Sequence, residues 1–106
     1  MDISVVILSF NSEKHIGKCL TALYDALQSA QLIGEVIVVE NGSVDNSLEC
    51  ISQHADKFGS ALHLINLGQN TGTTFSRNQA LKRASGKHVL VLDSDAYVNA
   101  KALKRL

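Results

Sequence analysis

Four short apolar runs alternate with segments of helical periodicity along this chain, and polar residues follow each run. The runs are rich in Val, Ile and Leu, as in strands buried within a parallel sheet. The segments between them repeat apolar residues every three or four positions, as amphipathic helices do. Because strand–helix–strand units cross over with one hand, this alternation predicts an α/β fold. We expect a doubly wound, mainly parallel sheet of Rossmann-like βαβ units, with strands at residues 5–9, 36–39, 62–67 and 88–92.

Local signals also predict where the helices begin and which sides they bury. Asn11 or Ser12 can cap the first helix, and Asn99 can cap the last. The third helix, over residues 73–85, is expected to turn Phe75 and Leu81 toward the sheet. The weaker, partly alternating third run is expected nearer a sheet edge than the others.

The last apolar run ends abruptly in Asp93-Ser94-Asp95. We expect this strand to be buried on both faces, with its acids at the carboxyl end, where open α/β sheets bind ligands. Residues two apart on an extended chain point to the same side, so Asp93 and Asp95 can converge on one ligand. Close carboxylates repel unless a cation lies between them, and oxygen ligands suit Mg²⁺ or Mn²⁺. The pattern indicates a metal–phosphate site, and the alternative is an acidic loop that helps to cap the next helix.

Composition narrows the possible classes of protein. The chain has 106 residues, 45% hydrophobic and 19% charged, which predicts one folded domain and argues against disorder or a membrane span. Ten basic residues balance ten acidic ones, so we expect no nucleic-acid partner. Cys19 and Cys50 lack metal-ligand spacing and are expected to be small buried residues in a reducing compartment. No secretion signal is visible at Met1, so we expect a cytoplasmic location.

The polar residues after the four strands, taken together, resemble the motifs of family-2 inverting glycosyltransferases of the GT-A fold. Residues 5–11 read Val-Val-Ile-Leu-Ser-Phe-Asn, like that family's first strand and turn. Residues 38–47 read Val-Val-Glu-Asn-Gly-Ser-Val-Asp-Asn-Ser, like its Asp-x-Gly-Ser-x-Asp segment. Residues 70–81 are similar to its Asn-x-Gly…Arg-Asn-x-Gly loop and helix, and residues 92–95 match its Asp-x-Asp signature. The resemblance covers nearly the whole chain.

The resemblance implies that residues 1–106 form the N-terminal, nucleotide-sugar-binding part of such an enzyme, a GT-A domain truncated after the Asp-x-Asp segment. It implies a UDP or dTDP sugar as donor, Mg²⁺ or Mn²⁺ on the diphosphate, and inverting transfer to the hydroxyl of an unidentified glycan, lipid or protein acceptor. The acceptor-binding part and the catalytic base are then expected beyond Leu106. The residues implied to bind the donor are Ser9, Phe10, Asn11, Glu40, Asn41, Arg77, Asp93 and Ser94, and those implied to bind the metal are Asp93 and Asp95.

Two positions depart from the family's usual pattern. Glu40 stands where the family usually has Asp, and its carboxylate can accept the imide N–H of uracil or thymine. Because Glu is longer by one methylene, the choice between UDP and dTDP stays open. Residues 79–80 are Gln-Ala, whereas the family's Arg-Asn-x-Gly segment usually contains Gly here.

Other functions remain as alternatives. A dinucleotide-binding dehydrogenase needs a Gly-rich turn after the first strand, and Ser9-Phe10-Asn11-Ser12 has none. A haloacid-dehalogenase-like phosphatase would use Asp93 as nucleophile, but Tyr97 stands where that motif has Thr or Val. A catalytically inert nucleotide-binding module is the third class.

The fourth strand also predicts a physical property of the chain. Without further strands it becomes a sheet edge, and we expect self-association through it. For the full-length protein, the cytoplasmic face of a membrane is an alternative location.

Overall fold

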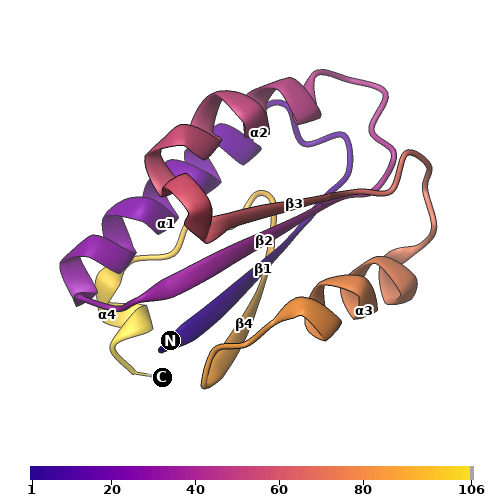
Figure 1. Ribbon diagram of the computed structural model, residues 1–106. Coiled ribbons are helices and arrows are strands. Elements are labelled where there is room, and N and C mark those ends of the chain that lie inside the picture. The colour runs from indigo at the N-terminus through magenta and orange to yellow at the C-terminus, as the bar shows by residue number, and fades with distance from the viewer. Residues whose placement is uncertain (106) are drawn as a thin grey trace.

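A computed structural model describes residues 1–105 and contains one four-stranded parallel sheet, with the strand order β3-β2-β1-β4 (Figure 1). The doubly wound α/β fold expected from the sequence is therefore confirmed. The elements are β1 (Ile3–Ser9), α1 (Ile16–Ala30), β2 (Gly34–Glu40), α2 (Ser47–Ala55), the 3₁₀ helix η1 (Asp56–Ala61), β3 (Leu62–Asn66), α3 (Thr73–Arg83), β4 (His88–Asp93) and α4 (Ala100–Leu103). No helix within residues 1–105 has the length and apolar character needed to cross a bilayer.

Helices cover both faces of the sheet, but unequally. Figure 1 shows α1, α2 and α4 on one side and α3 alone on the other. The main core lies on the first side, where alternate residues of β1 and β2 pack against α1, with Ile51 of α2 and Leu103 of α4. A smaller core on the other side joins Val6, Ile37 and Val39 to Ala80 of α3. Both central strands are thus buried on two faces, as their continuous apolar sequences predict.

The start of the first helix differs from the sequence-based expectation. Neither Asn11 nor Ser12 caps α1, which begins at Ile16 without a side-chain cap. Their polar groups bond instead to the segment after β2, more than 30 residues away in the sequence. The prediction for the last helix is confirmed, because Asn99 Oδ1 accepts a hydrogen bond from Ala102 N at 2.9 Å.

The third helix packs through small side chains rather than large ones. Ser76 and Ala80 are its buried residues, whereas Phe75 and Leu81 are exposed, contrary to expectation. Small residues allow a helix to lie close to a sheet, and this close approach turns the larger neighbours outward.

The fourth strand is a sheet edge and is covered on one face only. Leu90 and Leu92 pack against the main core, but Val89 and Val91 remain 46% and 41% exposed on the other face, although their register partners on β1, Ser4 and Val6, are buried. The expectation of a strand buried on both faces is therefore wrong. Apolar sequence indicates a preference for burial, but the neighbouring elements decide whether burial occurs.

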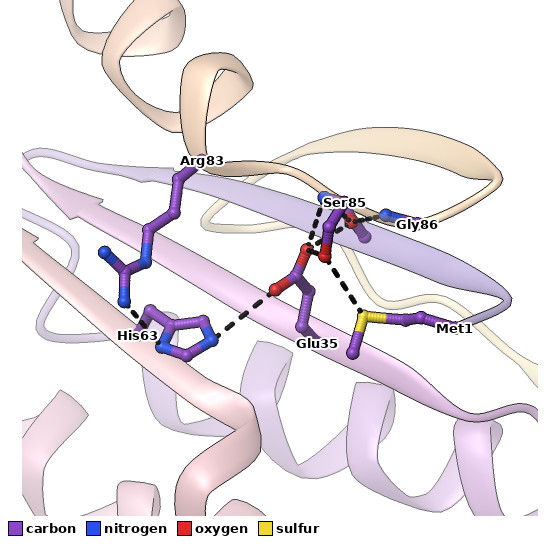
Figure 2. A network of polar contacts seen from close by, with 7 residues as sticks. Met1, Glu35, His63, Arg83, Ser85 and Gly86 are labelled. Atoms are coloured by element: carbon purple, nitrogen blue, oxygen red, sulfur yellow. Dashed lines mark hydrogen bonds and ion pairs between the residues drawn. The ribbon is translucent and has the colours of Figure 1, made fainter.

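A polar network joins the strands at their amino-terminal ends, opposite the Asp93–Asp95 segment (Figure 2). Glu35 is 4% exposed, and its carboxylate accepts hydrogen bonds from the Ser4 hydroxyl at 2.6 Å and from Ser85 N at 2.7 Å. His63 Nε2 lies 3.5 Å from the same carboxylate. A Cβ at Gly86 would lie 2.5 Å from backbone atoms of β1, so this close approach requires glycine.

Candidate functional site

The strand register brings the predicted donor-binding residues to one edge of the sheet. Ser9 at the end of β1 is paired with Glu40 at the end of β2, and Leu8 is paired with Asp93 at the end of β4. All three strand ends are carboxyl ends, because the strands are parallel. We call this edge, with the loops 9–13, 40–47 and 93–95, the carboxyl rim.

The first loop of the rim is held by the second. Asn11 has a left-handed φ of 49° and donates its backbone N–H to the Ser43 hydroxyl at 2.8 Å. Its side-chain oxygen accepts from Val44 N at 2.9 Å. Ser9 is buried, with its hydroxyl 2.6 Å from that of Ser12, whereas Phe10 is exposed. Phe10 is therefore accessible to a ligand, as is Asn11, which is also exposed.

Glu40 lies in the centre of the rim and is only 2% exposed. One oxygen of its carboxylate accepts a hydrogen bond from the Ser43 hydroxyl, which also receives the Asn11 N–H. Ser43 therefore fixes the carboxylate against the first loop. The sequence contained Ser43 within a recognised motif but did not indicate this positioning role.

Asp45 organises the other side of the same loop. Its carboxylate accepts from Ser47 N at 2.9 Å, from the Ser47 hydroxyl, and from Glu13 N at 3.2 Å. Burial opposes ionisation, but these hydrogen bonds outweigh it and lower the pKa of Asp45 below its ordinary value. The Asp-x-Ser spacing before a helix was the sequence signal for this contact, and the helix concerned is α2.

Asn41 connects the rim to the loop that precedes α3. Its side-chain oxygen accepts hydrogen bonds from Thr71 N at 2.9 Å and from the Thr71 hydroxyl at 3.0 Å, and its amide donates to Asn70 Oδ1 at 3.3 Å. Gly42, at φ 78°, lies so close to Gln69 and Asn70 that a Cβ would be 2.4 Å from the backbone. Asn41 thus holds a loop in place and has little hydrogen-bonding capacity left for a ligand.

Asp93 and Asp95 are exposed, and Ser94 between them is half-buried. A turn closed by Ala96 N bonding to Asp93 O at 3.0 Å carries them. Within residues 1–105, no side-chain hydrogen bond or ion pair engages either carboxylate. Exposed, uncommitted carboxylates are suitable ligands for a hard divalent cation such as Mg²⁺ or Mn²⁺. The described residues contain no cluster of three or more His, Cys, Asp or Glu that could hold a metal, so other ligands must complete such a site.

Cys19 of α1 lies beneath the acidic turn. Its thiol is 4.0 Å from the Asp93 carbonyl oxygen. Burial and, secondarily, the negative charge of Asp95 raise the pKa of Cys19 to about 11. The thiol is therefore neutral and packs as a small apolar group, as the sequence predicted.

Arg77 lies on α3, the helix that follows the 68–72 loop, and not on one of the three loops of the carboxyl rim. It is exposed on α3, and no hydrogen bond or ion pair to the carboxyl rim fixes it in the described part of the chain. An open groove of about 650 Å³ between α1 and α2 contains none of the predicted donor-binding residues, although Glu13 and Tyr97 line the end nearest the rim. The predicted site is therefore the open carboxyl rim rather than this groove.

Comparison with known proteins identifies the family of this fold and rim. The family model described as "Glycosyl transferase family 2" matches residues 4–106. The chain belongs to glycosyl transferase family 2. The family-2 assignment from the sequence is confirmed, and the phosphatase alternative is set aside.

Two bacterial relatives are similar to this chain over nearly its whole length. The chain is 34% identical over 105 residues to a poly(ribitol-phosphate) beta-glucosyltransferase of Bacillus spizizenii, covering 99% of this chain and 16% of that protein. It is 38% identical over 106 residues to the poly(ribitol-phosphate) beta-N-acetylglucosaminyltransferase TarS of Staphylococcus aureus, covering 98% of this chain and 18% of that protein. The chain thus spans less than a fifth of the length of either relative.

A solved structure of a related protein has the same fold. The crystal structure of S. aureus TarS 1–349 in complex with UDP-GlcNAc superposes with a TM-score of 0.86 at 36% sequence identity. The match covers 99% of this chain and 30% of that one. The GT-A type of fold expected from the sequence is therefore confirmed.

Proposed function

We propose that the carboxyl rim binds a nucleoside-diphosphate sugar, most simply a UDP sugar, for inverting transfer to an acceptor hydroxyl. The observation that carries this proposal is the pair of exposed carboxylates of Asp93 and Asp95, free of side-chain partners within residues 1–105, on the same rim as the buried Glu40. Family membership and the related structure with UDP-GlcNAc support it.

The acidic turn is proposed to hold a divalent cation together with the donor diphosphate. Asp93 and Asp95 would supply carboxylate oxygens, and the diphosphate would supply others, which suits a turn without a third acidic neighbour. When bound, such a cation neutralises negative charge that develops on the departing diphosphate. The chain's own contribution is to place two carboxylates on a turn that is anchored through β4 and supported by Cys19.

The remaining rim residues would orient the nucleoside. Ser43 holds one oxygen of the Glu40 carboxylate, and the other can accept the imide N–H of the base. Phe10 offers an exposed ring beside it for stacking. Asn41 would act by positioning the 68–72 loop rather than by touching the donor.

The acceptor and the base that deprotonates its hydroxyl are proposed to lie outside residues 1–105. The relatives named above act on poly(ribitol-phosphate), so a hydroxyl of a polyol-phosphate polymer is the acceptor class we propose. We also propose that the chain functions in the cytoplasm.

Calorimetric titration of the chain with UDP and UDP-GlcNAc tests donor binding directly. We expect saturable binding in Mn²⁺ or Mg²⁺ and its loss in a chelator. If neither nucleotide binds, with the divalent cation or with the chelator, the proposed donor site is wrong and the chain is only a structural module. Incubation with a phosphomonoester should give no phosphoenzyme at Asp93.

Glu40→Gln should reduce the preference for UDP over CDP by roughly tenfold, because an amide can present either a donor or an acceptor to the base. A carboxylate, in contrast, favours the imide N–H of uracil over the bare ring nitrogen of cytosine. Calorimetry with both nucleotides measures the ratio, and Glu49→Gln on the exposed side of α2 is the matched control. Equal affinity of the unaltered protein for UDP and CDP would contradict the role assigned to Glu40.

We further propose that the isolated chain self-associates through β4, whose outer edge is unpaired and whose Val89 and Val91 are exposed. Sedimentation velocity should show a concentration-dependent dimer or larger species. Val91→Lys should shift the equilibrium to monomer, whereas Val44→Lys, at the exposed tip of the 40–47 loop, should not. A monomer at high concentration of the unaltered chain would refute this proposal.

A further inference from the structure

Charge is unevenly distributed along this neutral chain. Residues 77–106 contain seven of the ten Lys and Arg residues but only two of the ten Asp and Glu residues, and those two are Asp93 and Asp95 on the carboxyl rim. The seven basic residues lie on α3, on or just after α4, and in the segment that leads into β4. These are Arg77, Lys82, Arg83, Lys87, Lys101, Lys104 and Arg105.

Two of these residues, Lys87 and Lys104, meet at the amino-terminal end of the sheet, which we call the amino pole. Lys87 N bonds to Met1 O at 3.3 Å, next to the start of β1. Lys87, His88 and Lys104 line a hollow of about 270 Å³ there, together with Asp2 and Leu32. Figure 1 shows the N-terminus, α4, the start of β4 and the α1–β2 connection at this same end.

Two large apolar side chains project from the amino pole. Ile33 is 71% exposed and Met1 is 53% exposed. Ile33 is held firmly, because Asp2 N donates to Ile33 O and Ile33 N donates to the Asp2 carboxylate, both at 2.8 Å. The pole therefore presents two exposed apolar side chains near Lys87 and Lys104, and the backbone of Ile33 is fixed.

The acidic groups of the pole keep their negative charge but lie deeper than the lysines, since Lys87 and Lys104 are exposed. Asp2 is half-buried and bonded to Ile33 N, and Glu35 is buried in its network with Ser4 and Ser85. Basic side chains that surround exposed apolar ones match the interface of an anionic bilayer, where phosphates pair with Lys and apolar tips enter the headgroup region. A soluble polyanion or nucleic acid would use the charges but would gain nothing from Ile33.

We propose that the amino pole docks onto a bilayer that contains anionic phospholipid. Lys87 and Lys104 contact lipid phosphates, and Ile33 and Met1 enter the interface. Asp93 and Asp95 lie at the opposite end of β1 and β4, so a docked chain turns the carboxyl rim away from the bilayer. This inference goes beyond the proposed donor site and does not depend on it.

Co-sedimentation with large unilamellar vesicles tests the proposal. We expect the chain to bind vesicles of phosphatidylcholine with 30% phosphatidylglycerol, and to bind pure phosphatidylcholine much more weakly. The double change Lys87→Gln/Lys104→Gln should weaken binding about 30-fold, from the usual gain per basic residue near an anionic surface. Lys14→Gln/Lys18→Gln, just before and on α1, removes the same charge elsewhere and should leave binding unchanged.

The contribution of apolar side chains to binding distinguishes a bilayer from a soluble polyanion as the partner. Ile33→Ser should weaken vesicle binding several-fold, whereas Val44→Ser at the other end of the molecule should not. Failure of the chain to bind anionic vesicles would overturn the proposal, and so would binding to heparin as tight as to vesicles with no effect of Ile33→Ser. Circular dichroism confirms folding of each variant, and UDP titration of the same variants reports the donor site separately.

Discussion

Asp95→Asn should reduce the affinity of the chain for UDP in Mn²⁺ by roughly 30-fold. The change removes one charged oxygen ligand, and charge-assisted contacts of this kind contribute about 2 kcal/mol or more. The fold should be unaffected, because the Asp95 carboxylate is exposed and makes no hydrogen bond or ion pair within residues 1–105. Calorimetry measures the affinity, and thermal unfolding in the absence of ligand measures the stability.

Two controls test whether the loss of UDP affinity in Asp95→Asn is specific to the acidic turn. Asp25→Asn, on the exposed side of α1, removes the same charge and should leave UDP affinity unchanged. With a chelator present, the unaltered protein and Asp95→Asn should bind UDP equally weakly. If the unaltered protein keeps its full affinity in chelator, the metal role of Asp93 and Asp95 is wrong.

Glu35→Ala should lower the free energy of unfolding by about 2–4 kcal/mol at neutral pH, since it leaves buried hydrogen-bond donors without an acceptor. The carboxylate accepts from the Ser4 hydroxyl, Ser85 N and the Ser85 hydroxyl, at 2.6, 2.7 and 2.9 Å (Figure 2). Glu35→Gln keeps one acceptor oxygen and should cost less. Urea denaturation measures both variants, and Glu49→Gln, on the exposed side of α2, should change stability by less than about 0.5 kcal/mol.

The effect of Glu35 should also depend on pH. Burial opposes its ionisation, but the hydrogen bonds from Ser4 and Ser85, together with His63, lower the pKa of Glu35 below its ordinary value. A carboxyl whose pKa is lower in the folded state stabilises the protein above its unfolded-state pKa, about 4.3, and this stabilisation is lost as pH falls through the folded pKa. The difference between the unaltered protein and Glu35→Gln should therefore be constant near neutral pH and shrink below about pH 4. A difference that grows on acidification would refute the ionised network.

The sequence predicts a structural feature correctly where the residues that form it lie close together in the chain. The apolar runs indicated all four strands, and the strand bounds differ from the expected ones by two residues at most. Asn99 caps α4 because its partner, Ala102, is three residues away. Parallel strands bring their carboxyl ends to one edge, so the gathering of Ser9, Glu40 and Asp93 followed from topology alone.

The sequence does not predict the hydrogen bonds of a residue whose partner is distant in the chain. Asn11 and Ser12 are residue types that often cap helices, but Asn11 Oδ1 accepts from Val44 N, 33 residues away, and the Ser12 hydroxyl bonds to that of Ser9. In the same way, no local pattern indicates that Asn41 bonds to the 68–72 loop, whose residues lie about 30 positions away in the sequence.

The sequence by itself determined the class of fold, the family and the edge of the sheet that carries the chemistry, because hydrophobic periodicity and polar strand ends are local patterns. Tertiary structure alone decided which apolar residues are covered. Val89 and Val91 stay exposed because no helix within residues 1–105 lies over that face of β4, and Phe75 turns outward because Ser76 and Ala80 approach the sheet. Tertiary structure also decided that Glu35 is a buried, ionised centre, since its stabilising donors come from β1 and from the segment after α3. Burial and hydrogen bonding depend on groups brought together by folding, and a linear pattern of residues does not contain their distances.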